Sequence, residues 1–270
     1  MIHALDHIVI AAAAPDAAVA DYEMLLGRRA DRSAASGSPA GGSFQLANMR
    51  LDLAAATAGD AEGLCALVFA VADVDKARHL LGQRALPLVK TDASHVLHIA
   101  AEATHGVPLG LVERAPGAAG LPPSPATCEL DAAVVGLDHV VIRSPNPERA
   151  VALYAGRLGL SLRLDRSEPA WGARLLFFRC GDLIVEVAHD LKAGVSDGPD
   201  RLWGVSWRVP DIAKAQARLR TAGVDVSDIR PGRRPRTQVF TAKSHTAGLP
   251  TLVIGDAAVG SRQWAVGSRQ

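Results

Sequence analysis

The chain has 270 residues, of which 49% are hydrophobic and 21% charged, which is ordinary usage for a globular protein. This composition excludes a disordered chain, because enough apolar side chain is present to offset the entropy lost on folding. Twenty-nine basic residues against 28 acidic residues give a formal charge of +1. Nucleic-acid binding is therefore not expected, since it usually needs a basic excess or a basic face. The one basic cluster, Arg230 to Arg236, is expected to be a solvated loop between strands, with an anion-facing rim as the alternative.

The sequence indicates a cytoplasmic protein with no membrane contact. Three cysteines are an odd number without metal-finger spacing, so a disulfide framework is not expected. The apolar N-terminal run is interrupted by Asp6 and His7 and lacks the basic start of a signal peptide. No stretch reaches the roughly 20 apolar residues that a membrane span requires.

Short segments of the first half recur in the second half in the same order, which indicates an internal duplication. The matched pairs are Leu5–Ile10 with Leu137–Ile142, Leu26-Gly27 with Leu158-Gly159, Leu51–Leu53 with Val185–Val187, Val71–Val74 with Val209–Ile212, and Thr104–Pro108 with Thr246–Pro250. We expect domain 1 at residues 1–115, a Pro, Gly and Ala linker at 116–133, domain 2 at 134–258 and a loose tail at 259–270.

Each domain is predicted to contain two units of one strand, one helix and further strands. In domain 2, a β-branched strand is followed by a helix that Asn146 caps and Pro147 begins. A second helix follows Asp211 and ends near Gly223. The strands of domain 2 are expected at residues 137–143, 160–165, 173–180, 182–189, 203–209, 238–242 and 250–254.

The order of these elements and their motifs resembles the vicinal oxygen chelate superfamily, which contains glyoxalases, bleomycin-resistance proteins and extradiol dioxygenases. The motifs are the LDH strand followed by a helix that ends in Leu-Gly, the V-x-D boundary, and the segment THGVPLGLVE at Thr104 to Glu113. The resemblance implies an α+β fold with two tandem domains. Each domain would have two βαβββ units that form a curved mixed sheet around a cleft. Because this superfamily hosts many chemistries, the fold does not define the reaction.

In metal-binding members of the superfamily, His and carboxylate side chains from four strands meet at the cleft floor. Carried over to domain 2, the resemblance implies His139 and Glu186 as ligands, with Gly204 and Thr251 at the other two ligand positions. Glu186 also stands inside the apolar run LIVEV, where an unpaired charge is costly to bury. A structural role for His139, hydrogen-bonded to a neighbouring carboxylate, remains an alternative.

Domain 1 matches the ligand pattern more weakly. Its corresponding positions are His7, Asp52, Ala66 and Gly110, so that both domains keep two ligand types and lose the other two. Asp52 could alternatively form an ion pair with Arg50 or Arg28. Since three protein ligands are usual for catalytic zinc, a further ligand would have to come from elsewhere in the chain.

Four other residues of domain 2 are candidates for the site. His245, just before the last strand, is a candidate third ligand or general base. Arg208 and Ser206 would share the cleft face with Gly204 because side chains alternate along a strand, and Arg208 could bind an anionic group. Trp171 lies in a loop where its ring could cover a pocket. Trp203, by the same alternation, is expected to pack on the helices.

These features favour a glyoxalase-like or dioxygenase-like enzyme that acts on a small oxygenated substrate. It would be a metal-dependent lyase or isomerase, or a dioxygenase, with Zn, Fe, Mn or Ni held in domain 2. The alternative is a metal-free protein that sequesters a small molecule, as bleomycin-resistance proteins do, since the expected His and Glu are missing at Gly204 and Thr251. The small residues at both places would also widen the cleft. A third interpretation is an interaction module. The chain could be a monomer or a homodimer.

Overall fold

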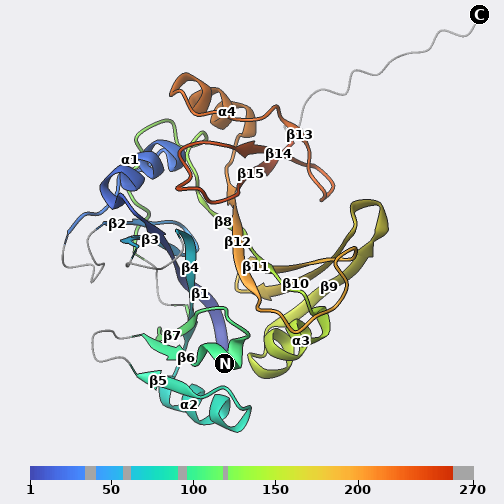
Figure 1. Cartoon of the computed structure of the whole chain (residues 1–270). Coiled ribbons are helices and arrows are strands. Elements are labelled where there is room, and N and C mark those ends of the chain that lie inside the picture. Colours follow the sequence, from blue (N-terminus) through green and yellow to red (C-terminus); the bar gives the residue numbers. More distant parts are fainter. Residues whose placement is uncertain (34–40, 57–61, 91–95, 118–120, 258–270) are drawn as a thin grey trace, which may run out of the picture.

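The computed structural model describes residues 1–33, 41–56, 62–90, 96–117 and 121–257. It contains two mixed β-sheets, one from each half of the chain, with helices on their outer faces (Figure 1). This arrangement confirms the predicted α+β class. The expected tail at 259–270 lies outside the described residues. Within the described part of the chain, no helix is long and apolar enough to cross a membrane.

The first sheet has seven strands in the order β2-β3-β1-β4-β7-β6-β5. Its strands are β1 (Ile2–Ala12), β2 (Gly42–Gln45), β3 (Arg50–Ala55), β4 (Gly63–Val71), β5 (Leu88–Lys90), β6 (Leu97–Ile99) and β7 (Leu109–Glu113). The helices of this half are α1 (Pro15–Leu26) and α2 (Val74–Gln83), with a short 3₁₀ turn at Ala101–Thr104. The central strand β1 runs parallel to β3 and antiparallel to β4.

The second sheet repeats this plan with eight strands in the order β13-β14-β15-β12-β8-β11-β10-β9. Its strands are β8 (Gly136–Arg143), β9 (Ser161–Glu168), β10 (Ala173–Cys180), β11 (Leu183–Asp190), β12 (Arg201–Arg208), β13 (Arg230–Pro231), β14 (Thr237–Ala242) and β15 (Thr251–Asp256). Its helices are α3 (Pro147–Val151), which continues as a π-helical segment at Ala152–Arg157, and α4 (Ile212–Thr221), with a 3₁₀ turn at Pro169–Trp171.

The caps predicted from sequence begin the helices of domain 2. The Asn146 side chain accepts a hydrogen bond from the Arg149 backbone N–H at 3.1 Å, and Pro147 occupies the first turn. Asp211 accepts from the backbone N–H groups of Ala213 and Lys214 at the start of α4. These contacts satisfy N–H groups that have no partner within the helix, so the helices start where the sequence places them.

Alternate residues of each central strand face the helices and form the core. On β8, Val140 and Ile142 are fully buried in the core cluster, whereas the residues that alternate with them, His139 and Val141, point to the other face. We call this second face, turned away from the helices, the inner face of the sheet. The two-residue alternation therefore separates the packing residues of the strand from those that can meet a ligand.

The segment between the two halves is held against domain 1 along part of its length. The Arg28 side chain donates hydrogen bonds to the carbonyl groups of Ser124 and Val134, and the Ser124 hydroxyl accepts from the Gln45 backbone N–H. The Thr127 N–H bonds to the Gly27 carbonyl at 2.9 Å. Where the structure describes it, at residues 116–117 and 121–133, the predicted linker contains no helix or strand and is anchored by side-chain and backbone contacts.

Candidate functional site

The strand register of domain 2 brings His139 and Glu186 to the same face. Glu186 on β11 lies opposite Val141 of the parallel strand β8, two residues from His139. Directly opposite residues in a sheet point to the same side, and so do residues two apart on one strand. Both side chains therefore point to the inner face, and the His139 Nε2 atom lies 3.6 Å from the Glu186 Oε2 atom.

Asp138 fixes the orientation of the His139 ring. The Asp138 Oδ2 atom is 2.9 Å from His139 Nδ1, and Oδ1 accepts a hydrogen bond from Arg234 at 2.8 Å. Arg208 adds a longer contact, at 3.5 Å from its Nε atom to Oδ1. Burial alone would raise the pKa of Asp138, but the hydrogen bond from His139 and the charges of His139 and Arg234 outweigh it and lower the pKa to about 2. An ionised Asp138 holds the Nδ1–H group and leaves Nε2 facing Glu186.

Glu186 is a buried carboxylate whose negative charge has few compensating cations or hydrogen-bond donors. Its side chain is 9% exposed, and its neighbours across the strands are Phe177 and Val141. Among the described residues, His139 is its only charged partner, and no donor lies within hydrogen-bonding distance of its carboxylate. An ionised carboxylate in such surroundings is stabilised only when a positive charge or a set of donors accompanies it.

The two remaining positions of the implied ligand set offer no ligand atom to the inner face. A Cβ atom on Gly204 would lie 2.7 Å from the Pro250 carbonyl oxygen, so the chain before β15 already fills this space. The expectation that Gly204 widens the cleft is therefore wrong. Thr251 is also not on the inner face: the register pairs Ser206 with Leu252, while the buried Thr251 pairs with Val205 and bonds the Leu249 carbonyl.

Ser206 supplies an oxygen atom that sequence analysis placed correctly on the inner face. It lies directly opposite His139 in the antiparallel pair of β8 and β12. The residue is fully buried, and its hydroxyl group has no hydrogen-bond partner within the described part of the chain. Buried hydroxyl groups are normally paired, whereas this atom is, among the described residues, an unpaired polar group in a packed environment that is closed to water, on the strand position opposite His139.

Domain 1 repeats the His–carboxylate pair with one difference. Asp6 contacts His7 Nδ1 at 2.7 Å, and His7 Nε2 lies 3.9 Å from Asp52 Oδ2. Asp52, however, is engaged by Arg50, whose Nε and Nη2 atoms contact its two oxygen atoms at 2.8 Å each. The alternative pairing of Asp52 with Arg50 is thus the one that the structure contains, and Arg28 instead binds backbone carbonyl groups.

Two other sequence candidates lie away from the pair. His245 sits on the side of α1, where its Nδ1 atom contacts Ser244 at 2.9 Å and its Nε2 atom lies 3.8 Å from Asp21. Arg208 lies opposite Gly136, at the start of β8. Its acidic contacts are Asp182 at 3.4 Å and Asp138 at 3.5 Å. Arg208 and Arg234 both line a pocket of about 310 Å³ that Asp138 shares. This pocket adjoins the His139 ring through Asp138.

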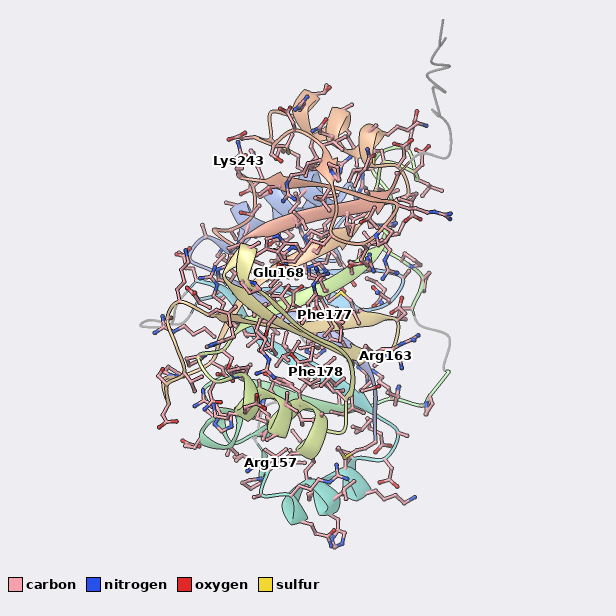
Figure 2. The ribbon with its side chains drawn as sticks, turned by 90° about the vertical axis from the view of Figure 1, so that its right-hand side faces the viewer. Arg157, Arg163, Glu168, Phe177, Phe178 and Lys243 are labelled. Carbon is pink, nitrogen blue, oxygen red and sulfur yellow. The ribbon has the colours of Figure 1, made fainter. Side chains whose placement is uncertain are left out.

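The rim of the inner face carries Trp171 between two guanidinium groups. Arg233, from the loop between β13 and β14, stands 4.6 Å from the ring centre, and Arg166 of β9 stands 5.2 Å from it. Since β9 and β13 are the opposite edges of the sheet, this contact joins the two edges. We call it the rim clasp. Figure 1 shows the two hairpins approaching each other, and Figure 2, which faces this side, places Phe177 near its centre.

The expectation that Trp203 packs on the helices is wrong. The pairing of β12 with β8 shifts by one residue between Leu202 and Gly204, so Trp203 lies in a β-bulge and is 40% exposed. Arg143 stacks over its ring at 4.5 Å from the ring centre. A bulge cancels the two-residue alternation locally, and nothing in the strand sequence marks its position.

Sequence reasoning assigned no role to two residues that shape this site, Asp138 and Pro250. Asp138 precedes His139 as Asp6 precedes His7, and this repeated Asp-His pair was a usable signal. Pro250 had none, because it reaches the site through a contact between distant segments, whereas Arg234 belongs to the basic run whose alternative role was an anion-facing rim.

The donor set accommodates a divalent ion only in part. Within the residues that the structure describes, no three His, Cys, Asp or Glu side chains converge in a way that could hold a metal ion. The His139 and Glu186 atoms, 3.6 Å apart, do fit two ligands of one ion at about 2.1 Å from each. With the unpartnered Ser206 hydroxyl, the face offers one nitrogen and two oxygen atoms, a set compatible with hard divalent ions that keep water or substrate oxygen in their other positions.

Comparisons with known proteins identify the family. The model of the Glyoxalase/Bleomycin resistance protein/Dioxygenase superfamily matches residues 138–240. Ethylmalonyl-CoA/methylmalonyl-CoA epimerase of Cereibacter sphaeroides is 30% identical over 97 residues, which cover 33% of this chain and 72% of that protein. The chain belongs to this superfamily, which is the vicinal oxygen chelate superfamily.

Solved structures show the same two-domain fold. The Mn(II)-bound glyoxalase from Novosphingobium aromaticivorans gives a TM-score of 0.69 at 14% identity, covering 94% of this chain and 82% of that chain. The 2,2',3-trihydroxybiphenyl 1,2-dioxygenase from Sphingomonas wittichii strain RW1 gives 0.68 at 18% identity, covering 94% and 91%. At these identities the likeness establishes the fold and not the reaction.

Proposed function

We propose that domain 2 is the active half of an isomerase-type or lyase-type enzyme that acts on a small oxygenated molecule with a divalent ion at His139 and Glu186. One observation carries this proposal: within the described part of the chain, the buried Glu186 carboxylate has no cationic partner other than His139. Its counterpart in domain 1 has Arg50 as a partner. Domain 2 is therefore short of one positive charge at this place, and a divalent ion would supply it.

The side chains around the pair have separate roles in this proposal. A divalent ion at this face would polarise neighbouring oxygen atoms of a substrate. Asp138 keeps His139 in the tautomer whose Nε2 faces the site, and the buried Ser206 hydroxyl could donate to a substrate oxygen if the side chains that cover it move. Phe177 and the 47%-exposed Leu164, which pair across β9 and β10, give an apolar wall for the rest of the molecule.

An isomerase or lyase is favoured over a dioxygenase by the sequence comparison. The relative that is 30% identical is an epimerase, whereas the likeness to the dioxygenase rests on fold alone. The epimerase acts on acyl-CoA esters by its name, so small carboxylic acids and their thioesters are the first substrates to test. Arg208 and Arg234, beside the Asp138 end of the site, provide positive charge for an anionic group of such a molecule.

Metal binding by the purified protein tests the proposal. Equilibrium dialysis against Mn²⁺, Zn²⁺, Ni²⁺ and Fe²⁺ should give one bound ion per chain in domain 2. Glu186→Gln should abolish that binding, because the amide lacks the negative charge. Glu168→Gln, on the rim at the end of β9, is the matched control and should keep the ion. Loss of the ion in both variants, or binding that survives Glu186→Gln, would refute the assignment.

The second candidate function is metal-free binding of a small molecule. It is favoured by the Pro250 carbonyl, which closes the Gly204 position to any side-chain ligand. If the wild-type chain takes up none of the four ions, the enzyme proposal fails and this candidate replaces it. Ligand screening by thermal shift would then use the same acids and thioesters, with Glu186→Gln to locate the binding to domain 2.

A further inference from the structure

The two halves of the chain place different residues at one equivalent position. In domain 1, Arg50 on β3 lies opposite His7, and Asp52 lies opposite Val9, two residues further along β1. In domain 2, Ile184 on β11 lies opposite His139, and Glu186 lies opposite Val141. The duplicated strands pair in the same parallel register, so Arg50 and Ile184 occupy matching places beside matching His–carboxylate pairs.

Arg50 uses that place to occupy both oxygen atoms of Asp52. Its Nη2 atom donates a hydrogen bond to Oδ2 at 2.8 Å, and its Nε atom lies 2.8 Å from Oδ1 in an ion-pair contact that lacks hydrogen-bond geometry. His7 keeps the same orientation as His139, since Asp6 contacts its Nδ1 atom. Domain 1 has therefore retained the imidazole and the carboxylate, and differs in the origin of the positive charge beside them.

We propose that the Arg50 guanidinium is a built-in substitute for a divalent ion, and that it blocks a latent metal site formed by His7 and Asp52. A metal ion on Asp52 would have to displace the Arg50 hydrogen bond to Oδ2 and the Arg50 Nε atom beside Oδ1, and it would also be repelled by the fixed positive charge. The proposal shares its ligand chemistry with the function proposed for domain 2. It is tested on domain 1 alone, so that either can fail without the other.

The structure also predicts that the uncovered site is weaker than that of domain 2. Val68 lies opposite His7, at the position where domain 2 has Ser206 opposite His139. The domain 1 site would therefore offer one nitrogen and one carboxylate without the neighbouring hydroxyl group. Substituting Val68 by serine in addition should strengthen binding, because it restores the third oxygen-bearing neighbour.

The experiment uses the full chain with Glu186→Gln, so that domain 2 makes no contribution, and Co²⁺ as the probe. Equilibrium dialysis and the visible absorption of bound Co²⁺ report the ion directly, without an activity assay. We expect no bound ion in the Glu186→Gln chain and one in Glu186→Gln/Arg50→Ile. Adding Val68→Ser should increase the affinity several-fold. Arg50→Lys keeps the positive charge and should give no ion.

Two results would overturn the proposal. One is an ion bound to the Glu186→Gln chain and lost on Asp52→Asn, because Arg50 would then not block the site. The other is that Glu186→Gln/Arg50→Ile binds no Co²⁺ at millimolar concentration although its circular dichroism and melting curve show that it is folded. If Arg50→Ile does not fold, Arg50→Gln provides the same neutral charge with a polar side chain, and the same two outcomes apply to it.

Discussion

Replacing Gly204 by alanine tests why domain 2 lacks a ligand on β12. The added Cβ atom would lie 2.7 Å from the Pro250 carbonyl oxygen and 3.3 Å from the Pro250 Cβ atom. That carbonyl accepts a hydrogen bond from the Val205 N–H at 3.0 Å, so it cannot move without disturbing the pairing of β12 with β15. We expect a loss of about 1–3 kcal/mol, the usual cost of overpacking. Glycine-to-alanine changes inside strands normally gain roughly 0.5–1 kcal/mol, so the sign is diagnostic.

Urea unfolding followed by circular dichroism measures this difference in the free energy of unfolding. Gly82→Ala in α2 is the matched control, because no atom lies within 4 Å of its added Cβ and its backbone is helical. It should gain about 0.5–1 kcal/mol. A Gly204→Ala chain as stable as the wild type, or more stable, would refute the argument. It would show that the β12 position has room for a side chain and that a histidine ligand could be introduced there.

Three further predictions concern single contacts. Tyr22→Phe removes the 3.2 Å hydrogen bond to the buried Thr246 carbonyl and should cost about 1–3 kcal/mol in a thermal melt, so an unchanged melting temperature would contradict it. Burial and a nearby carboxylate raise the pKa of the Cys180 thiol to about 12. Between pH 7 and 9, iodoacetamide should therefore label Cys180 more slowly than the partly exposed Cys65 and Cys128, and peptide mapping that finds Cys180 labelled first would contradict this. Trp171→Ala removes the rim clasp and should speed hydrogen exchange in the loop of Arg233, whereas unchanged exchange would mean that the contact does not stabilise this loop.

Much of the fold could be predicted because its signals are local. The Asn146 and Asp211 caps act within three residues of themselves, and both helices begin there. The placement of His139 beside Glu186 followed from the resemblance, and the register of two neighbouring parallel strands bears out their shared face. Signals of this kind need only the strand period and a short stretch of sequence.

The parts that sequence did not predict depend on contacts between distant segments. The identification of Thr251 as the fourth ligand position failed by one residue, because a register between β12 and β15 is set by the whole sheet and a one-residue slip reverses every side chain. The closure of the Gly204 position depends on where Pro250 passes, and the burial of Asp138 under Arg234 depends on a loop almost a hundred residues away. No local pattern records these approaches.

Hydrogen bonds between the two halves, next to the anchored segment, affect how the molecule responds to dilution. Arg218 of α4 donates hydrogen bonds to the carbonyl groups of Met24 and Leu25 at the end of α1, and its Nε atom bonds the Ala132 carbonyl. Between separate subunits such contacts would weaken as the protein concentration falls, because association then carries its own entropic cost. Here both sides belong to one chain and face each other at a fixed effective concentration, so the contact between the halves holds at any dilution.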